Sequence, residues 1–161
     1  MNEKYLVVFD TVALVQRVIA PEGNAAKCFA YFEAGIIAVA ISRATLKELK
    51  DVLSRPYIRD RFPHITDEMV TWLSEFLLEE GEYQRTVPRH FTYPRDPKDE
   101  PPINLAIEAN AHYLISRDKD LLDLMDWNNP DGREFQRRFR WLKIVKPEEF
   151  LLVMADSDKR P

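Results

Sequence analysis

Short apolar runs alternate along the chain with stretches in which apolar residues recur every three or four positions, as Leu46, Leu49 and Leu53 do. The short runs predict buried strands over residues 5–9, 36–41, 112–116 and 141–145. Apolar strands that alternate with helices are typical of a parallel sheet that is covered on both faces. The pattern therefore predicts an α/β fold.

Capping residues predict where the helices begin and end. Asn24, Ser42 and Thr66 can each cap a helix, Gly35 and Gly81 can end one, and Pro101 with Pro102 can open another. We expect a loop over residues 82–94, with one short strand near 85–87, and a turn-rich break over residues 126–132. The helices are expected over residues 24–34, 42–55, 57–62, 66–81, 101–110, 119–124, 133–140 and 147–154.

The composition is that of a globular protein. The chain has 161 residues, of which 45% are hydrophobic and 31% charged, so we expect one domain over residues 1–161. Its apolar stretches are too short to span a bilayer, and the strand-like run near the N-terminus predicts no signal peptide. The single cysteine, Cys28, excludes an internal disulfide and any cysteine-rich metal site. Together these features favour a buried structural thiol and a cytoplasmic location.

The net charge of −4 argues against a protein that coats nucleic acid by bulk attraction. It leaves open an enzyme that acts on nucleic acid, because bound cations neutralise an acidic metal site. The distribution of charge is therefore more informative than the total.

Two of the predicted strands run directly into aspartates, Asp10 and Asp118. In an open parallel sheet, sites form beyond the carboxyl ends of strands where the strand order reverses. Glu48 lies outside the leucine stripe of its helix, and Asp99 comes just before a helix. Four carboxylates from four segments can therefore converge on one crevice.

Such a cluster suits Mg²⁺ or Mn²⁺, because hard cations prefer oxygen ligands. A metal site of this kind can activate water and offset charge on a phosphodiester. Each acid also has a simpler interpretation, since an aspartate after a strand can be a turn or cap residue and Glu48 can be a solvated helix residue. The combination of the four favours the metal site; we interpret Asp96 and Asp120 as caps.

Other chemistries fit the sequence less well. A dinucleotide site needs a glycine-rich first turn, which "FDTVAL" lacks. A haloacid-dehalogenase-type phosphatase needs a second aspartate where Val12 stands, and a receiver domain needs paired acids after the first strand. The three histidines have no metal-ligand spacing, and no serine or cysteine lies in an obvious nucleophile elbow.

The basic segment "REFQRRFRWLK" has Phe135 and Phe139 four positions apart, so they can share a buried helix face. One interpretation is an amphipathic surface helix. The other is a patch that binds RNA phosphates or a partner beside the acidic crevice. Its arginines are Arg133, Arg137, Arg138 and Arg140.

Four segments in this order resemble the PIN-domain family, and within it the VapC-like toxin branch: "VVFDT", "ATLKELKDVLSRP", "DPKDEPPINLAIEANAHYLISRDKDLL" and "KIVKPEEFL". The resemblance spans roughly residues 5–150. It implies a three-layer α/β/α fold with a five-stranded parallel sheet of order 3-2-1-4-5. It also implies a ribonuclease that depends on Mg²⁺ or Mn²⁺, with Asp10, Glu48, Asp99 and Asp118 as the metal-binding acids.

The resemblance further implies RNA as the substrate, a small antitoxin protein as a partner and a homodimer as an assembly. The chain departs from the family pattern at two motif positions, and its segment 127–140 is long for this branch. Val12 stands where the family usually has asparagine, and "SRD" replaces the usual "TGD" before Asp118. The alternative hypothesis is a PIN fold that binds RNA or a protein without cleaving, which Val12 favours and the complete set of four acids opposes.

Overall fold

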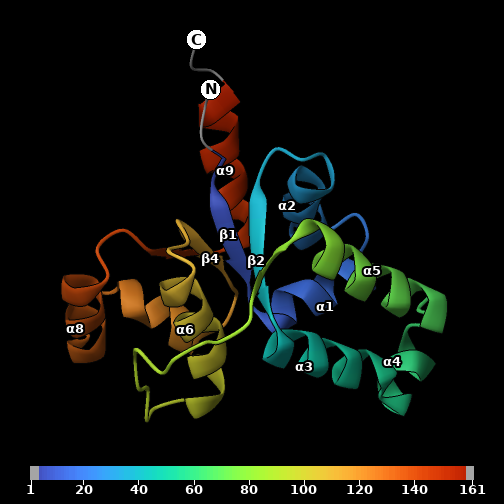
Figure 1. Cartoon of the computed structure of the whole chain (residues 1–161), viewed down its shortest axis with the longest axis horizontal. Coiled ribbons are helices and arrows are strands. Elements are labelled where there is room, and N and C mark those ends of the chain that lie inside the picture. Colours follow the sequence, from blue (N-terminus) through green and yellow to red (C-terminus); the bar gives the residue numbers. More distant parts are fainter. Residues whose placement is uncertain (1–3, 159–161) are drawn as a thin grey trace.

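Five parallel strands form the middle layer of the protein, and helices cover both of its faces (Figure 1). The structure is a computed structural model that describes residues 4–158. The strands lie in the order β3-β2-β1-β4-β5, which confirms both the α/β class and the order 3-2-1-4-5. They are β1 (Leu6–Phe9), β2 (Ala38–Ser42), β3 (Glu82–Gln84), β4 (Tyr113–Ile115) and β5 (Lys143–Val145).

Alternating strand residues build two apolar layers, because successive side chains point to opposite faces of a sheet. Val7 and Phe9 of β1 belong to one buried cluster and Val8 to the other. The first face is covered by α1 (Thr11–Ile19), α2 (Asn24–Glu33), α3 (Arg43–Ser54), α4 (Pro56–Arg61), α5 (Asp67–Glu80) and α9 (Pro147–Asp158). The second is covered by α6 (Glu100–Glu108), α7 (Lys119–Leu122), η2 (Asp123–Met125) and α8 (Pro130–Arg138).

The strand order reverses at β1, the central strand. The chain adds β2 and β3 on one side of β1, and later adds β4 and β5 on the other. β1 and β4 pair in register, with Phe9 opposite Ile115. Their carboxyl ends therefore meet at the point where open α/β sheets place their ligand sites.

Local sequence signals predicted several features correctly. The Ser42 hydroxyl caps α3 by accepting from the Thr45 amide at 3.3 Å. The Thr66 hydroxyl caps α5 in the same way. Cys28 is fully buried, as expected, and Phe135 and Phe139 are buried on one face of α8.

Other boundaries differ from the predictions. Helix α1 was not predicted, yet it follows Asp10 directly because the Asp10 carboxylate caps it. Gly23, with no side-chain cap, precedes α2 in place of Asn24. Strand β3 lies about three residues before its predicted position, since its place is set by pairing with β2. Helix α8 begins at Pro130 inside the predicted turn, because Asn129 caps it and proline suits a first helical position.

No helix within residues 4–158 is both long enough and apolar enough to cross a membrane. The predicted domain limits, residues 1 and 161, lie outside the described residues.

Buried Asn104 on α6 fixes the loop that follows β3. Its Oδ1 accepts from the main-chain amides of His90 and Phe91, each at 2.8 Å, and its Nδ2 donates to the Phe91 carbonyl at 3.1 Å. The side chain is only 5% exposed. A loop with little regular structure is therefore held against α6 by main-chain bonds to one residue.

Asn104→Ala should lower the free energy of unfolding by about 2 kcal/mol, because it leaves buried main-chain groups without partners. Chemical denaturation followed by circular dichroism measures this. Asn128→Ala, at an exposed turn position, is the matched control and should change stability little. Equal stability of the two variants would contradict the role assigned to Asn104.

Candidate metal centre

Asp10 stands at the carboxyl end of β1 and is 5% exposed. Its Oδ1 accepts from the Ala13 amide at 2.7 Å, and its Oδ2 accepts a hydrogen bond from the Ser116 hydroxyl. The Asp10 amide donates to the Ile115 carbonyl at 3.1 Å, which ties it to β4. Asp10 is therefore held rigidly between the central strand, the first helix and the neighbouring strand.

Ser116 connects Asp10 to Asp118. Its Oγ donates to Asp10 and accepts from the Asp118 amide at 2.9 Å. The Asp118 carboxylate in turn accepts from the Asp120 amide at 2.9 Å and caps α7. Asp118 is thus a cap as well as a strand-end acid, so the structural and the functional interpretations both apply to it.

Asp99 ends the short helix η1 (Pro97–Asp99) and is 8% exposed. Its Oδ2 is buried and has no hydrogen-bond partner among the described residues. Asp99 belongs to a group of four aspartates whose carboxylate oxygens lie within 4.8 Å of one another, Asp96, Asp99, Asp118 and Asp120. The structure therefore brings two of the predicted acids, Asp99 and Asp118, into direct proximity.

Glu48 reaches the same edge of the sheet from α3. It is exposed, and its Oε2 accepts from the Thr11 hydroxyl at 3.0 Å, directly beside Asp10 in sequence. Its charge is close enough to contribute to the raised pKa of Asp10. Glu48 and Asp10 therefore lie near each other, and Ser116 connects Asp10 to Asp118 of the aspartate group.

The sequence analysis interpreted Asp96 and Asp120 as caps only, whereas both lie in the aspartate group. Asp96 does cap η1, accepting from the Lys98 amide at 3.2 Å. Asp120 lies in the first turn of α7. The signal available in the sequence was the spacing, since Asp96 precedes Asp99 by three residues and Asp120 follows Asp118 by two.

Arg95 already neutralises one member of this group. Its Nη2 lies 2.8 Å from Asp120 Oδ1 and 2.6 Å from Asp123 Oδ2, and Lys119 also pairs with Asp123 at 2.8 Å. Within residues 4–158, Asp96, Asp99 and Asp118 have no such basic partner. Within the group of four, these three are the acids left to bind an added cation.

Burial and nearby negative charges raise the pKa of two of the acids. Burial, followed by repulsion from Asp118 and Asp96, raises the pKa of Asp99 to about 8. Burial also raises the pKa of Asp10 to about 6, although hydrogen bonds from Ser116 and Ala13 act in the opposite direction. The protein therefore holds carboxylates whose negative charge is costly without a nearby cation.

A comparison with protein-family models matches residues 6–120 to the PIN domain. The chain belongs to the PIN-domain family. No curated protein matches the chain. PIN domains are generally nucleases that use divalent metals and act on RNA. The matched segment of this PIN domain contains Asp10, Glu48 and all four members of the aspartate group, whereas α8, β5 and α9 lie beyond it.

The two departures from the family pattern have different structural consequences. Val12, on the first turn of α1, is 54% exposed and offers no polar atom where asparagine is usual. The Arg117 guanidinium pairs with Glu148 of α9 at 2.8 Å and forms no ion pair with the acids of the site among the described residues. The replacement of glycine by Arg117 therefore adds an ion pair to the fold and leaves the acidic edge open.

The residues present fit a hard divalent cation. The donor set is entirely carboxylate, and one of its buried oxygens, Asp99 Oδ2, lacks a protein partner. Buried charges normally pair with opposite charge or bind metal. This PIN domain therefore contains a candidate acidic metal site.

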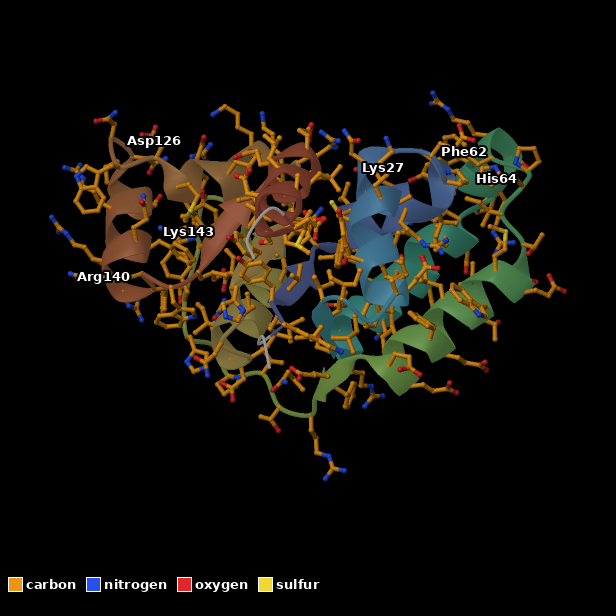
Figure 2. The ribbon with its side chains drawn as sticks, turned by 90° about the horizontal axis from the view of Figure 1, so that it is seen from above. Lys27, Phe62, His64, Asp126, Arg140 and Lys143 are labelled. Carbon is orange, nitrogen blue, oxygen red and sulfur yellow. The ribbon has the colours of Figure 1, made fainter. Side chains whose placement is uncertain are left out.

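The basic segment that contains the four arginines runs from α8 into the turn before β5. Arg137, Arg138 and Arg140 are exposed and Arg133 is half-buried. Arg138 donates to the His90 carbonyl at 2.9 Å, and the Arg137 guanidinium lies 5.5 Å from the Trp127 ring centre. In Figure 2, Arg140 lies beside α8 at the outer edge of the molecule, whereas Lys143 lies on the inner side of α8, toward the sheet. Lys143 begins β5, whereas the acids lie beyond the carboxyl ends of β1 and β4.

Raising the pH should destabilise the metal-free protein, because Asp99 binds a proton more tightly in the folded state than in the unfolded chain. Its contribution to stability is complete below about pH 4 and is lost as the pH rises through about 8. In EDTA, the thermal midpoint should therefore fall between pH 6 and pH 8.5. Asp99→Asn removes the titrating group and should flatten this fall.

The control for this measurement is Asp60→Asn, at an exposed position on α4, which should follow wild type. Millimolar Mn²⁺ should raise the wild-type midpoint at pH 8.5, because a ligand that binds only the folded state stabilises it. An identical pH profile for wild type and Asp99→Asn, with no response to Mn²⁺, would contradict the metal site.

Proposed function

We propose that this PIN domain is a metal-dependent endoribonuclease that hydrolyses RNA phosphodiester bonds, with Mg²⁺ or Mn²⁺ held by Asp10, Glu48, Asp99 and Asp118. The observation that carries the proposal is the buried Asp99, whose unpartnered oxygen lies among crowded aspartates at the carboxyl edge of the sheet. Membership of the PIN family supports it, because PIN domains are generally nucleases.

Each acid has a distinct task in this proposal. Asp99 and Asp118 are the direct ligands, and Asp96 lies close enough to assist them. Asp10 is fixed by Ser116 and Ala13, so its carboxylate keeps a constant position relative to Asp118. A bound cation would supply water activation and offset charge on the phosphate.

Glu48 is suited to accept a proton from the attacking water. It is exposed, and Thr11 fixes only its Oε2, so Oε1 has no protein hydrogen bond among the described residues. A carboxylate held by one oxygen and free at the other can act as a positioned base. It faces the acidic edge from the side opposite Asp99.

We further propose that the protein is the toxin of a toxin–antitoxin pair, acts in the cytoplasm and associates with a small antitoxin. The support is the resemblance of four ordered segments to VapC-like toxins. Expression should then arrest growth, and expression of an adjacent small gene should relieve the arrest. Size-exclusion chromatography with light scattering tests for a homodimer.

A second candidate function is RNA or protein binding without cleavage. The observation that favours it is Val12, which supplies no polar group at the first turn after Asp10. A weakened metal site would bind substrate without activating water. The two functions differ in whether the folded wild type cleaves RNA at all.

Asp118→Asn should abolish cleavage of single-stranded RNA while preserving the fold. The change keeps the shape of the side chain, and asparagine also caps helices well, so α7 should persist. It removes a charge needed to hold the cation. Stability should hold or rise slightly, because one member of a repelling cluster becomes neutral.

The assay compares wild type, Asp118→Asn and Asp60→Asn in Mg²⁺, Mn²⁺ and EDTA, with circular dichroism as the check on folding. Asp60→Asn should cleave like wild type. Cleavage by folded Asp118→Asn at the wild-type rate would overturn the assignment of Asp118. A wild type that binds RNA and Mn²⁺ but never cleaves would support the binding function instead.

We also propose that the α8 arginines contact RNA phosphates away from the metal centre. Changing Arg133, Arg137, Arg138 and Arg140 together to alanine should flatten the salt dependence of RNA binding, since each phosphate contact on a single strand contributes about 0.7 to the slope. Fluorescence anisotropy across a series of KCl concentrations measures the slope, and Mn²⁺ binding should be unchanged. An unaltered slope would show that α8 is a surface helix only.

A further inference from the structure

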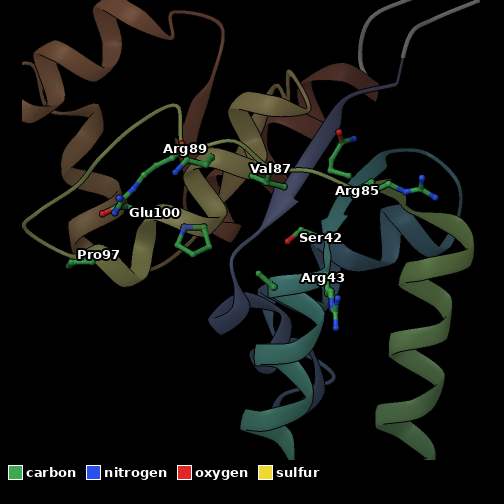
Figure 3. A pocket seen from close by; sticks show the side chains of 11 residues that line it. Ser42, Arg43, Arg85, Val87, Arg89, Pro97 and Glu100 are labelled. Carbon is green, nitrogen blue, oxygen red and sulfur yellow. The ribbon is translucent and has the colours of Figure 1, made fainter.

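A pocket of about 430 Å³ opens between the start of α3, the end of β3 and the start of α6 (Figure 3). Ser42 and Arg43 form one wall, and Gln84 with Arg85 continues it. Arg89 and Glu100 form the facing wall, with Val87 between them. We call this site the arginine pocket, after Arg43, Arg85 and Arg89.

The arginine pocket is positive in a protein whose net charge is −4. Three of its lining residues are arginines and one, Glu100, is acidic. The Arg89 guanidinium forms an ion pair with the Glu100 carboxylate at 2.8 Å. The hydrogen bond from Arg89 lowers the pKa of Glu100. Arg43 and Arg85 are exposed and have no ion-pair partner within residues 4–158. Figure 3 shows both of these side chains directed outward from the pocket, so their guanidinium groups lie in solvent beside it.

The wall that carries Arg89 is rigid. Asn104, which lines the pocket, holds the main chain at His90 and Phe91 by three hydrogen bonds. Glu100 is 5% exposed and fixes the Arg89 side chain through both Nε and Nη2. The opposite wall is fixed by the Ser42 cap of α3. A ligand would therefore meet a preformed cavity.

The arginine pocket lies next to the acidic edge. Glu100, in its wall, directly follows Asp99. Ser42 ends β2, which pairs with β1, and β1 ends beside Asp10. The pocket wall and the acidic edge are therefore built from neighbouring residues of the same elements.

We propose that the arginine pocket binds a backbone phosphate of single-stranded RNA next to the phosphodiester at the metal centre. The inference rests on the proposed nuclease function. A nucleic-acid strand carries regularly spaced phosphates, so one can meet the arginines while its neighbour meets the cation. Planar guanidinium groups suit phosphate oxygens, which they can contact with two parallel hydrogen bonds.

The test measures binding separately from cleavage. Anisotropy of a fluorescent single-stranded RNA in EDTA, over a series of KCl concentrations, gives the salt slope for each variant. Arg43→Ala/Arg85→Ala should reduce the slope by about 1.4, which is two contacts of about 0.7 each. Arg43→Lys/Arg85→Lys keeps both charges and should retain most of the slope, which distinguishes phosphate contact from a change of fold.

The matched control is Arg55→Ala/Arg61→Ala, which removes the same charge from the junction of α3 and α4 and from the end of α4, at the far end of α3 (Figure 1). It should bind RNA with the wild-type slope. In Mn²⁺, the Arg43→Ala/Arg85→Ala variant should show a raised KM with a nearly unchanged kcat, since it loses binding common to ground and transition states.

Equal slopes for wild type, Arg43→Ala/Arg85→Ala and the α4 control would overturn the arginine pocket as a phosphate site, as would a wild type that binds no RNA. If only the nuclease proposal is wrong, the result differs. Wild type then binds RNA with a salt dependence that requires Arg43 and Arg85, but it does not cleave the RNA in Mg²⁺ or Mn²⁺.

Discussion

Repulsion among carboxylates at the carboxyl edge of the sheet is the constraint on which this protein depends. Asp96, Asp99, Asp118 and Asp120 have oxygens within 4.8 Å of one another, and Asp10 and Glu48 lie beside them. Folding brings these charges together and partly removes them from water, which raises the pKa of Asp99 to about 8. Such an arrangement favours either bound protons or a bound cation.

Contacts in the surrounding fold reduce the free-energy cost of bringing the carboxylates together, but they do not remove it. Ser116 holds Asp10 and Asp118 in one network, Thr11 holds Glu48, and Arg95 neutralises Asp120. None of these contacts supplies a partner to Asp99 Oδ2. Within residues 4–158, Asp99 therefore keeps a buried oxygen that a bound cation could satisfy.

The local sequence determined the strands and most helices, because burial and capping are largely local properties. Apolar runs located four of the five strands, and Ser42 and Thr66 marked helix starts. Helix α1 was not predicted, although its cap, Asp10, directly follows β1 and an aspartate after a strand can cap a helix. Strand β3 has three residues and lies at the sheet edge, so only its pairing with β2 fixes its position.

The sequence by itself also determined that acids follow β1 and β4, because the end of an apolar run can be read directly from the order of the residues. Only the tertiary structure decided which acids share a site. Asp96 and Asp120 join Asp99 and Asp118 through the path of the loop that Asn104 holds against α6, and Arg95 on that loop neutralises Asp120. The physical reason is that carboxylate spacing depends on contacts between segments far apart in sequence, which no local pattern encodes.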